Sequence, residues 1–327
     1  MYDPNKPRIL VALGGKSAER EISISTGKSV TFALEKLGYP VSAIDIATGR
    51  FIQVPELETL EKDPKKMPEV VNLPLVDIKR HFSLVFIAMH GKFGEDGGLQ
   101  ALLEEMGMKY VGSGPVASAL AVNKKFSKEI FKAEGVPVLE HQIITKPDEK
   151  VNMKLPVVVK PNDQGSSFGV SICENEADLK IGIESAFKYS KEVMIEPYVK
   201  GKELTAAILD DDNGEAKPLP VTEIIPKERF FSYIAKYDGT TEEIAPARIS
   251  TDLTKRAQEL ALKAHLALGC RHLSRVDMMV DTSGKIFVLE LNNIPGLTAE
   301  SLFPKAEKAV GKTFEQLIDH LVKIALR

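Results

Sequence analysis

Residues 275–296, RVDMMVDTSGKIFVLELNNIPG, place two carboxylates and an amide within runs that are otherwise apolar and typical of β-strands. Asp277 lies in the first run, and Glu290 and Asn292 lie at the end of the second. Such acids are costly to remove from water unless a partner neutralises them. Oxygen ligands without His or Cys suit Mg²⁺ rather than zinc, and Mg²⁺ in proteins usually also holds substrate phosphates. The stretch therefore predicts a magnesium site in an ATP-using enzyme.

Residues 281–284, Asp-Thr-Ser-Gly, are typical of a turn, so the two runs should pair as a hairpin. Because side chains alternate along a strand, a loop of two or four residues would put Asp277 and Glu290 on one face, beside Arg275 and Asn292. A loop of three residues would split the acids across the sheet, and a glycine at the last turn position is compatible with that loop. An alternative reading of the cluster is a set of surface ion pairs. Four polar groups followed by Pro295-Gly296 favour the metal site.

The bulk composition is that of a soluble globular protein. The chain has 327 residues, 43% hydrophobic and 27% charged, which is enough for two or three domains. A formal net charge of −3 gives no reason to expect nucleic acid as a partner. Cys173 and Cys270 are predicted to be reduced packing residues. The first residues lack the apolar core of a signal peptide, and no apolar run is long enough to span a bilayer. We expect a cytoplasmic protein that is not in the membrane.

The first third of the chain alternates strand-like and helical patterns. Strands are predicted at 8–13, 40–46, 84–89 and 109–111, with helical spacing over 21–37 and 97–106. This alternation predicts an α/β domain with a parallel, Rossmann-like sheet and helices on both faces. Residues 51–74, rich in proline and charge, are predicted to be a variable loop.

Two further blocks follow. The second, from about residue 121, contains a lysine-rich helix at 123–134, strands at 155–159, 193–195 and 204–209, and a helix at 177–189. The third contains a polar loop at 227–246, a helix at 254–268, the acidic hairpin and a terminal helix at 313–326. We therefore predict domains at 1–120, 121–212 and 213–327, with the loop as a lid.

Two lysines are candidates for phosphate contacts. Lys160 follows a strand-like run and precedes the glycine- and serine-rich loop 162–169, whose backbone N–H groups could cradle phosphate oxygens. In a Walker A loop the lysine follows the glycines, so this is not that motif. Lys124 lies at the start of a helix, where a basic charge is mildly unfavourable unless it meets an anion. A plain turn and a solvated lysine are the structural alternatives.

Several other residues have both a functional and a structural interpretation. Glu196 and Glu203 could accept hydrogen bonds from ribose, with Tyr198 against adenine. Glu19 follows Gly14-Gly15 and could bind a substrate ammonium group, although acids in a first helical turn also have a purely structural explanation. Three lid and loop residues could close over the site, namely Lys236, Tyr237 and His90.

Together these segments resemble the D-alanine–D-alanine ligases of the ATP-grasp superfamily over nearly the whole chain. The motifs occur in family order: 13–21 (LGGKSAERE), 89–97 (MHGKFGEDG), 112–114 (GSG), Lys160 with 165–169 (GSSFG), 235–237 (AKY), 275–277 (RVD) and 290–292 (ELN). Each motif is weak alone, but the ordered set is specific. The resemblance implies an N-terminal α/β domain followed by a two-part ATP-grasp fold.

The resemblance also implies roles for individual residues. Nucleotide contacts would come from Lys124, Lys160, Ser167, Glu196, Tyr198, Val199 and Glu203. Two Mg²⁺ (or Mn²⁺) ions would be held by Asp277, Glu290 and Asn292. Substrate contacts would come from His90, Lys236 and Leu302. The catalytic set would be Glu19, Ser166, Tyr237, Arg275, Gly296 and Ser301, with Ser301 holding the carboxylate of the second substrate.

The implied reaction joins two D-alanine molecules through a D-alanyl phosphate, with ATP as co-substrate, for peptidoglycan precursor synthesis. By the same resemblance the protein is expected to be a homodimer. The family commonly has threonine where this chain has Asn293, so side-chain contacts there should differ. Tyr237 matches the dipeptide-forming ligases and disfavours a D-alanine–D-lactate ligase.

Three alternatives differ in class. One is another ATP-grasp carboxylate–amine ligase with different substrates. Another is a nucleotide-binding regulatory protein on the same fold, which is disfavoured because Arg275 and all the metal-ligand candidates are present. The last is a NAD-binding dehydrogenase, which fails because residues 14–19 do not form G-x-G-x-x-G.

Overall fold

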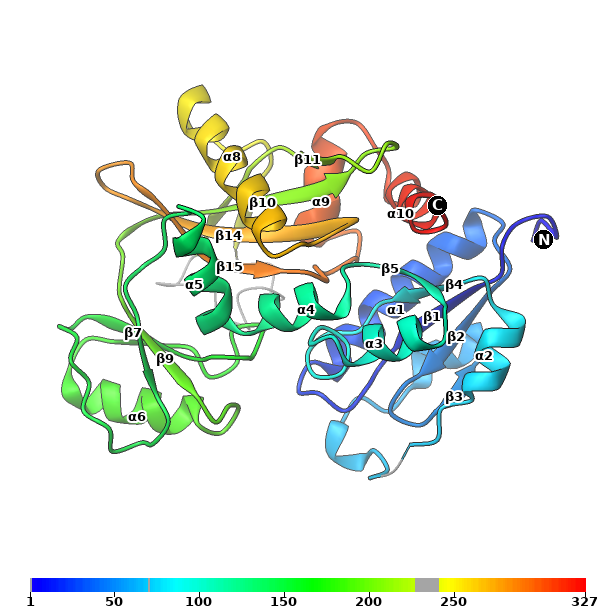
Figure 1. Ribbon diagram of the computed structural model, residues 1–327, viewed down its shortest axis with the longest axis horizontal. Helices are drawn as coiled ribbons and strands as arrows, with labels where there is room; N and C mark the ends of the chain where they lie inside the picture. The colour runs from blue at the N-terminus through cyan, green and yellow to red at the C-terminus, as the bar shows by residue number, and fades with distance from the viewer. Residues whose placement is uncertain (1, 70, 227–240) are drawn as a thin grey trace.

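The computed structural model describes residues 2–69, 71–226 and 241–327, and within them the strands form three sheets (Figure 1). The predicted lid residues Lys236 and Tyr237 lie outside the described residues. Across the described ranges, no helix combines the length and the apolar character needed to cross a membrane.

The first sheet has the strand order β3-β2-β1-β4-β5. The pairs β1–β2, β1–β4 and β4–β5 are parallel, and β3 is antiparallel to β2. Successive residues of β1 face opposite cores: Val11 packs with helices α1 and α10 (Phe314–Ala325), whereas Leu10 packs with α2 and α3. The expected parallel sheet with helices on both faces is therefore confirmed. The elements are β1 (Ile9–Leu13), α1 (Arg20–Lys36), β2 (Val41–Asp45), β3 (Arg50–Ile52), α2 (Leu75–His81), β4 (Leu84–Ile87), α3 (Gly98–Glu105) and β5 (Lys109–Val111).

The expectation that residues 51–74 form only a loop is wrong at its start. Strand β3 pairs with β2 after a turn at Thr48-Gly49, and Gly49 has a φ of +70°, which glycine adopts without strain. Two short 3-10 helices follow, η1 (Val54–Thr59) and η2 (Pro64–Lys66). Leu57 of η1 is buried in the same core as α1, which explains why part of this charged segment is ordered.

The second sheet, with order β6-β9-β7-β8, is antiparallel and is covered by α6. In Figure 1 it lies at the lower left, apart from the first sheet, with α4 between them and α5 above it. The elements are α4 (Pro115–Val122), α5 (Lys124–Ala133), β6 (Gln142–Ile144), β7 (Val157–Pro161), β8 (Ser171–Cys173), α6 (Glu176–Ala186) and β9 (Val193–Pro197).

The third sheet has the order β13-β12-β10-β14-β15, with β11 paired to β10. Helix α8 packs on one face of this sheet, and α10 reaches back to α1 of the first domain. Strand β10 lies on the N-terminal side of the predicted boundary at residue 212 yet pairs with β14 along its whole length. The elements are β10 (Gly201–Asp210), β11 (Ala216–Pro218), β12 (Thr222–Ile225), β13 (Glu242–Ile244), α8 (Thr251–Ala267), β14 (Leu273–Asp281), β15 (Ile286–Asn292), α9 (Leu302–Ala309) and α10 (Phe314–Ala325).

The β14–β15 hairpin combines a three-residue loop with a β-bulge. Asp281 N–H donates to Lys285 O, which leaves the three residues 282–284 as the loop, and Gly284 has a φ of +83°. In that register Met278 faces Val288, so a regular ladder would turn Glu290 away from Asp277. A register shift between Asp277 and Met278 leaves Leu289 as an extra residue and pairs Asp277 with Glu290, and Arg275 with Asn292. The loop that would split the acids is present, and the bulge returns them to one face.

A buried ion pair ties α1 to the first sheet. Arg20 donates to Asp45 through Nη1 at 2.9 Å and Nη2 at 2.7 Å, and the two side chains are 1% and 2% exposed. The guanidinium also donates to the carbonyl oxygens of Gly15 and Glu61. The charge of Arg20 is thus neutralised and four of its five N–H donors are hydrogen-bonded, which is the condition for a buried ion to be tolerated.

We predict that Asp45→Asn lowers the free energy of unfolding by about 3–5 kcal/mol, because it leaves Arg20 buried without a counter-ion. Thermal or urea unfolding followed by circular dichroism measures the loss. The matched control is Lys36→Met, which breaks the Lys36–Glu315 pair, where the lysine is 73% exposed. That variant should stay within about 1 kcal/mol of the unmodified protein. Equal losses in the two variants would contradict the importance of the buried pair.

Candidate active site

A cavity of about 550 Å³ lies between the second and third sheets. Apolar side chains from both sides line it, including Val158, Ile172, Met279 and Leu289. It also collects every nucleotide-binding candidate and two of the metal candidates from the sequence. Those lining residues are Lys124, Lys160, Ser167, Glu196, Tyr198, Val199, Glu203, Asp277 and Glu290.

The two acids of the hairpin are each paired with a cation. Arg275 donates two hydrogen bonds to Asp277, from Nε at 2.8 Å and Nη2 at 2.7 Å. Thr205 of the adjacent strand β10 donates to the same carboxylate at 2.6 Å. Glu290 lies 3.1 Å from the ammonium group of Lys124. Arg275 and Lys124 therefore balance the charges of the two carboxylates at this edge of the cavity, and Thr205 adds a hydrogen bond.

The loop after β7 connects this cavity to the first domain. Ser166 and Ser167 have φ values of +50° and +57°, a left-handed conformation that is unusual for residues other than glycine. Ser167 lines the cavity, while the Ser166 hydroxyl donates to the Glu19 carboxylate. The ammonium group of Lys124 donates to Gln164 O at 2.7 Å and holds the start of the loop. Strained backbone that is held by its surroundings often marks a functional site.

Glu196 on β9 is bracketed by two lysines. Its Oε2 lies 2.6 Å from Lys160 Nζ, and its Oε1 lies 2.6 Å from Lys128 Nζ. Burial would raise the pKa of Glu196, but the charges of Lys128 and Lys160 outweigh it and lower the pKa to about 2. The carboxylate is therefore ionised in the folded protein.

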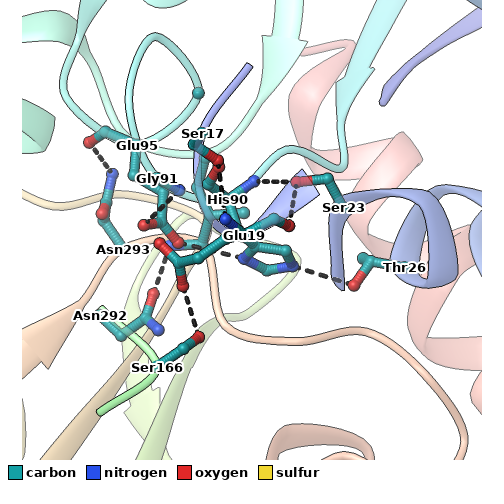
Figure 2. Close-up of polar contacts among 12 residues, drawn as sticks. Ser17, Glu19, Ser23, Thr26, His90, Gly91, Glu95, Ser166, Asn292 and Asn293 are labelled. Atoms are coloured by element: carbon teal, nitrogen blue, oxygen red, sulfur yellow. Dashed lines mark hydrogen bonds and ion pairs between the residues drawn. The ribbon is translucent and has the colours of Figure 1, made fainter. Parts of the chain in front are cut away.

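A second polar cluster surrounds Glu19 and His90 at the carboxyl edge of the first sheet (Figure 2). His90 Nδ1 lies 3.1 Å from Glu95 Oε1, and Nε2 lies 2.9 Å from the Thr26 hydroxyl. Burial would lower the pKa of His90, but the hydrogen bond to Glu95 and the negative charges of Glu95 and Glu19 outweigh it and raise the pKa. Arg275 acts in the opposite direction. The cluster therefore favours the protonated imidazolium.

Backbone contacts fix this cluster from both sides. The Ser17 hydroxyl donates to His90 O at 2.8 Å, and His90 N–H donates to the Ser23 hydroxyl at 2.8 Å. A Cβ atom at Gly91 would lie 2.8 Å from Glu19 Oε2, and one at Gly165 would lie 3.0 Å from Oε1. Both glycines therefore let main chain approach the Glu19 carboxylate closely.

The two asparagines after Glu290 have different surroundings. Asn292 Oδ1 accepts a hydrogen bond from Ile294 N–H at 3.0 Å. Asn293 is buried and donates to Glu95 O at 3.2 Å and to the Ser118 hydroxyl at 2.9 Å. Asn293 therefore connects the end of β15 to the loop that carries His90 and to α4, a pair of donations that a threonine could not make.

The remaining candidates lie at the start of α9. The Ser301 hydroxyl accepts a hydrogen bond from Thr298 N–H at 3.1 Å, and Leu302 is buried against Ile224. A Cβ atom at Gly296 would lie 3.0 Å from Ser301 Oγ. Gly296 and Ser301 are therefore neighbours in space.

Sequence reasoning missed Lys128, Thr26 and Glu223. Lys128 lies one helical turn after Lys124, and a spacing of four residues indicates that both side chains lie on the same face of the helix. Glu223 of β12 lines the cavity and pairs with Lys202 at 2.5 Å. Thr26 and Glu223 give no local signal, because their partners are distant in sequence.

The chain is similar along its whole length to known ligases. Residues 8–113 match the family described as D-ala D-ala ligase N-terminus, and residues 130–323 match D-ala D-ala ligase C-terminus. A D-alanine–D-alanine ligase of Syntrophobacter fumaroxidans is 42% identical over 98% of each chain.

Two solved structures share the fold. One is the D-alanine–D-alanine ligase from Bacillus anthracis complexed with ATP, with a TM-score of 0.76, 31% identity and 98% of each chain covered. The other is the VanG D-Ala:D-Ser ligase from Enterococcus faecalis, with a TM-score of 0.81, 31% identity, and 98% of this chain and 100% of that chain covered. The expected ATP-grasp architecture is thereby confirmed, and the chain belongs to the D-alanine–D-alanine ligase family.

Proposed function

We propose that this protein joins two D-alanine molecules to D-alanyl-D-alanine at the expense of ATP, as a step in peptidoglycan precursor synthesis. The observation that carries the proposal is one continuous site. The cavity lined by Lys124, Lys160 and Glu196 adjoins the Glu19–His90 cluster through the loop at Ser166 and Ser167. A nucleotide in the cavity and an amino acid beside Glu19 would be neighbours.

The cavity suits ATP by its chemistry. Lys124 and Lys160 supply positive charge for phosphates, and Tyr198 and Val199 with the apolar lining suit a base. Glu203 lines the same wall and would accept hydrogen bonds from ribose hydroxyls. Ser167 would present its hydroxyl or backbone to a phosphate.

Asp277, Glu290 and Asn292 fit Mg²⁺ or Mn²⁺ by their donor set. All three offer oxygen, and the acids face one another across the hairpin. Three side chains leave coordination positions for phosphate oxygens and water, which is the usual arrangement for Mg²⁺ at a nucleotide. Among the described residues, no group of three His, Cys, Asp or Glu side chains forms a separate metal site. When bound, two such ions would neutralise charge on the transferring phosphoryl group.

The reaction proceeds in two balanced steps. A carboxylate oxygen of the first D-alanine attacks the γ-phosphorus of ATP, the bond to the β-phosphate oxygen breaks, and ADP leaves. The amine of the second D-alanine then attacks the acyl carbon, phosphate leaves, and the amine loses a proton. Phosphorylation is needed because a carboxylate has no adequate leaving group.

The protein side chains would bind and orient the two amino acids. Glu19, held by Ser166, would bind the ammonium group of the first D-alanine, and protonated His90 would face its carboxylate. Arg275 and the N–H of Gly296 would stabilise the tetrahedral oxyanion. Ser301 and Leu302 would contact the second D-alanine. Lys236 and Tyr237, outside the described residues, would complete the site from a lid at 227–246.

We propose three domains at 1–120, 121–212 and 213–327, with β10 completing the sheet of the third. The first would hold the amino acid, and the other two would enclose the nucleotide. The fold alone does not fix the identity of the second substrate, because a D-Ala:D-Ser ligase shares the fold at a TM-score of 0.81. A ligase that accepts another D-amino acid is the second candidate.

Phosphate release from Mg²⁺-ATP tests the function directly. Reactions contain D-alanine alone, L-alanine alone, or D-alanine with D-serine or D-lactate, and products are identified by mass spectrometry. D-alanyl-D-alanine formed with stoichiometric phosphate supports the proposal. A mixed product in preference to the dipeptide would favour the second candidate, and folded protein that releases no phosphate would overturn both.

We predict that Glu290→Gln lowers turnover at least tenfold, because a carboxamide is a weaker ligand for Mg²⁺ than a carboxylate. Steady-state assays across a Mg²⁺ titration measure the change. Glu184→Gln, an exposed position on α6, is the control and should retain full activity. Normal turnover of Glu290→Gln at low Mg²⁺ would remove Glu290 from the metal site.

We predict that Glu95→Gln lowers the pKa of His90, because it removes the hydrogen bond and charge that raise that pKa. Because the pKa of His90 is higher in the folded than in the unfolded state, its protonation stabilises the fold. This stabilisation is complete at pH values below the unfolded histidine pKa of about 6.5 and is lost as the pH rises through the folded pKa. In Glu95→Gln the free energy of unfolding should depend less on pH over this range. NMR titration of histidine and unfolding between pH 5.5 and 8.5 measure both effects. Glu129→Gln, at the exposed partner of His141, is the control.

We predict that the protein is a homodimer, an expectation that rests on the family. Multi-angle light scattering over a range of concentrations should give twice the chain mass of 35.9 kDa. A constant mass of one chain at working concentration would refute it.

A further inference from the structure

Lys128 is a buried lysine that lies behind the wall of the cavity. It is on α5, one helical turn after Lys124, and its side chain is 0% exposed. Its ammonium group lies 2.6 Å from Glu196 Oε1 and donates to Val288 O at 3.5 Å. Lys128 does not line the cavity, whereas Glu196 does. The ion pair of Lys128 with the cavity wall is therefore made through Glu196.

The Glu196 carboxylate is shared between two ammonium groups, one on each side. Lys160 contacts Oε2 from the cavity side, and Lys128 contacts Oε1 from the interior. Two ammonium groups and one carboxylate give this trio a net charge of about +1. The neighbouring pair of Lys124 and Glu290 adds no net charge. An uncompensated positive charge next to a cavity is unfavourable until an anion arrives.

The consequence for Lys160 follows from this charge balance. With Glu196 as its sole ionic partner, Lys160 would be neutralised and held against the wall. With Lys128 on the other oxygen, the negative charge of Glu196 is already balanced. The positive charge of Lys160 can then attract an anion in the cavity. The two contacts also fix the carboxylate plane, since each oxygen has its own cation.

We infer that Lys128 is a positioning residue for the nucleotide: it neutralises and orients Glu196 from behind and thereby leaves Lys160 free to attract an anion. This inference rests on the proposed function, because it takes the anion to be ATP. A purely structural alternative is that Lys128 only joins α5 to β9. That alternative predicts lower stability without a selective change in ATP binding.

The test compares Lys128→Met, which keeps the length of the side chain and removes its charge, with Lys132→Met. Lys132 is exposed on the same helix and is the matched control. ATP binding is measured by calorimetry, and steady-state kinetics give kcat and the KM values for ATP and D-alanine. In Lys128→Met the Kd and KM for ATP should rise at least tenfold. kcat should change less than threefold, the KM for D-alanine should be unchanged, and Lys132→Met should behave like the unmodified protein.

The pH dependence of ATP binding supplies a second readout. Burial is the largest influence on the pKa of Lys128 and lowers it to about 8, with Glu196 and Glu290 raising it and Lys160 lowering it further. ATP affinity of the unmodified protein should therefore fall as pH rises from 7 to 9.5, while Lys128 loses its proton. Lys128→Met should lack this fall. The same pH slope in both proteins would overturn the inference.

A thermodynamic cycle keeps the inference testable if Lys128→Met is unstable. In Glu196→Gln the carboxylate is gone, so adding Lys128→Met should not reduce ATP affinity further. Additive losses would overturn the inference. So would an unchanged Kd in folded Lys128→Met when the unmodified protein binds ATP. If the unmodified protein does not bind ATP, the proposed function itself fails and this inference fails with it.

Discussion

Buried charge has to be balanced, and this requirement organises the site. Asp277 is balanced by Arg275, Glu290 by Lys124, and Glu196 by Lys128 and Lys160. The pairs of Lys124 and Lys128 join α5 to strands that are distant in the sequence. The pair of Arg275 and Asp277 fixes two side chains on one face of β14. Helix α5 is consequently tied by ion pairs to the second sheet, through Glu196, and to the third sheet, through Glu290. A ligand that brings phosphate and a metal ion would exchange partners with these ion pairs and would meet the positive charge that two lysines on one carboxylate leave over.

Much of the architecture could be predicted from the sequence because it depends on local patterns. The parallel first sheet followed from apolar runs that end in glycine, with helical spacing between them. All of the nucleotide candidates line one cavity, although each was weak alone. The order of motifs along the chain supplied the information that spacing within any one motif lacked.

The register of the hairpin could not be predicted, because it depends on a bulge. The turn at 281–284 is compatible with loops of two, three or four residues, and the apolar side chain of Leu289 does not mark it as an extra residue. Lys128 was missed for a related reason. Its partner Glu196 is far away in sequence, and a lysine on a helix usually faces water. The start of the segment 51–74 was assigned to a loop because charge and proline conceal the buried contact of Leu57. Lys236 and Tyr237 stay predictions, since they lie outside the described residues.

The left-handed backbone at Ser166 and Ser167 has a consequence for the coupling of the two ligand positions. Holding two consecutive non-glycine residues there costs about 1–3 kcal/mol each, so the loop would relax if its anchors were released. Two of its anchors are the Glu19 carboxylate on one side and Lys124 on the other. A ligand that draws Glu19 or Lys124 away would change the energy of the loop, so binding at one site would change the affinity at the other. In thermodynamic terms, the amino acid and the nucleotide would influence each other's affinity through the backbone strain at Ser166 and Ser167.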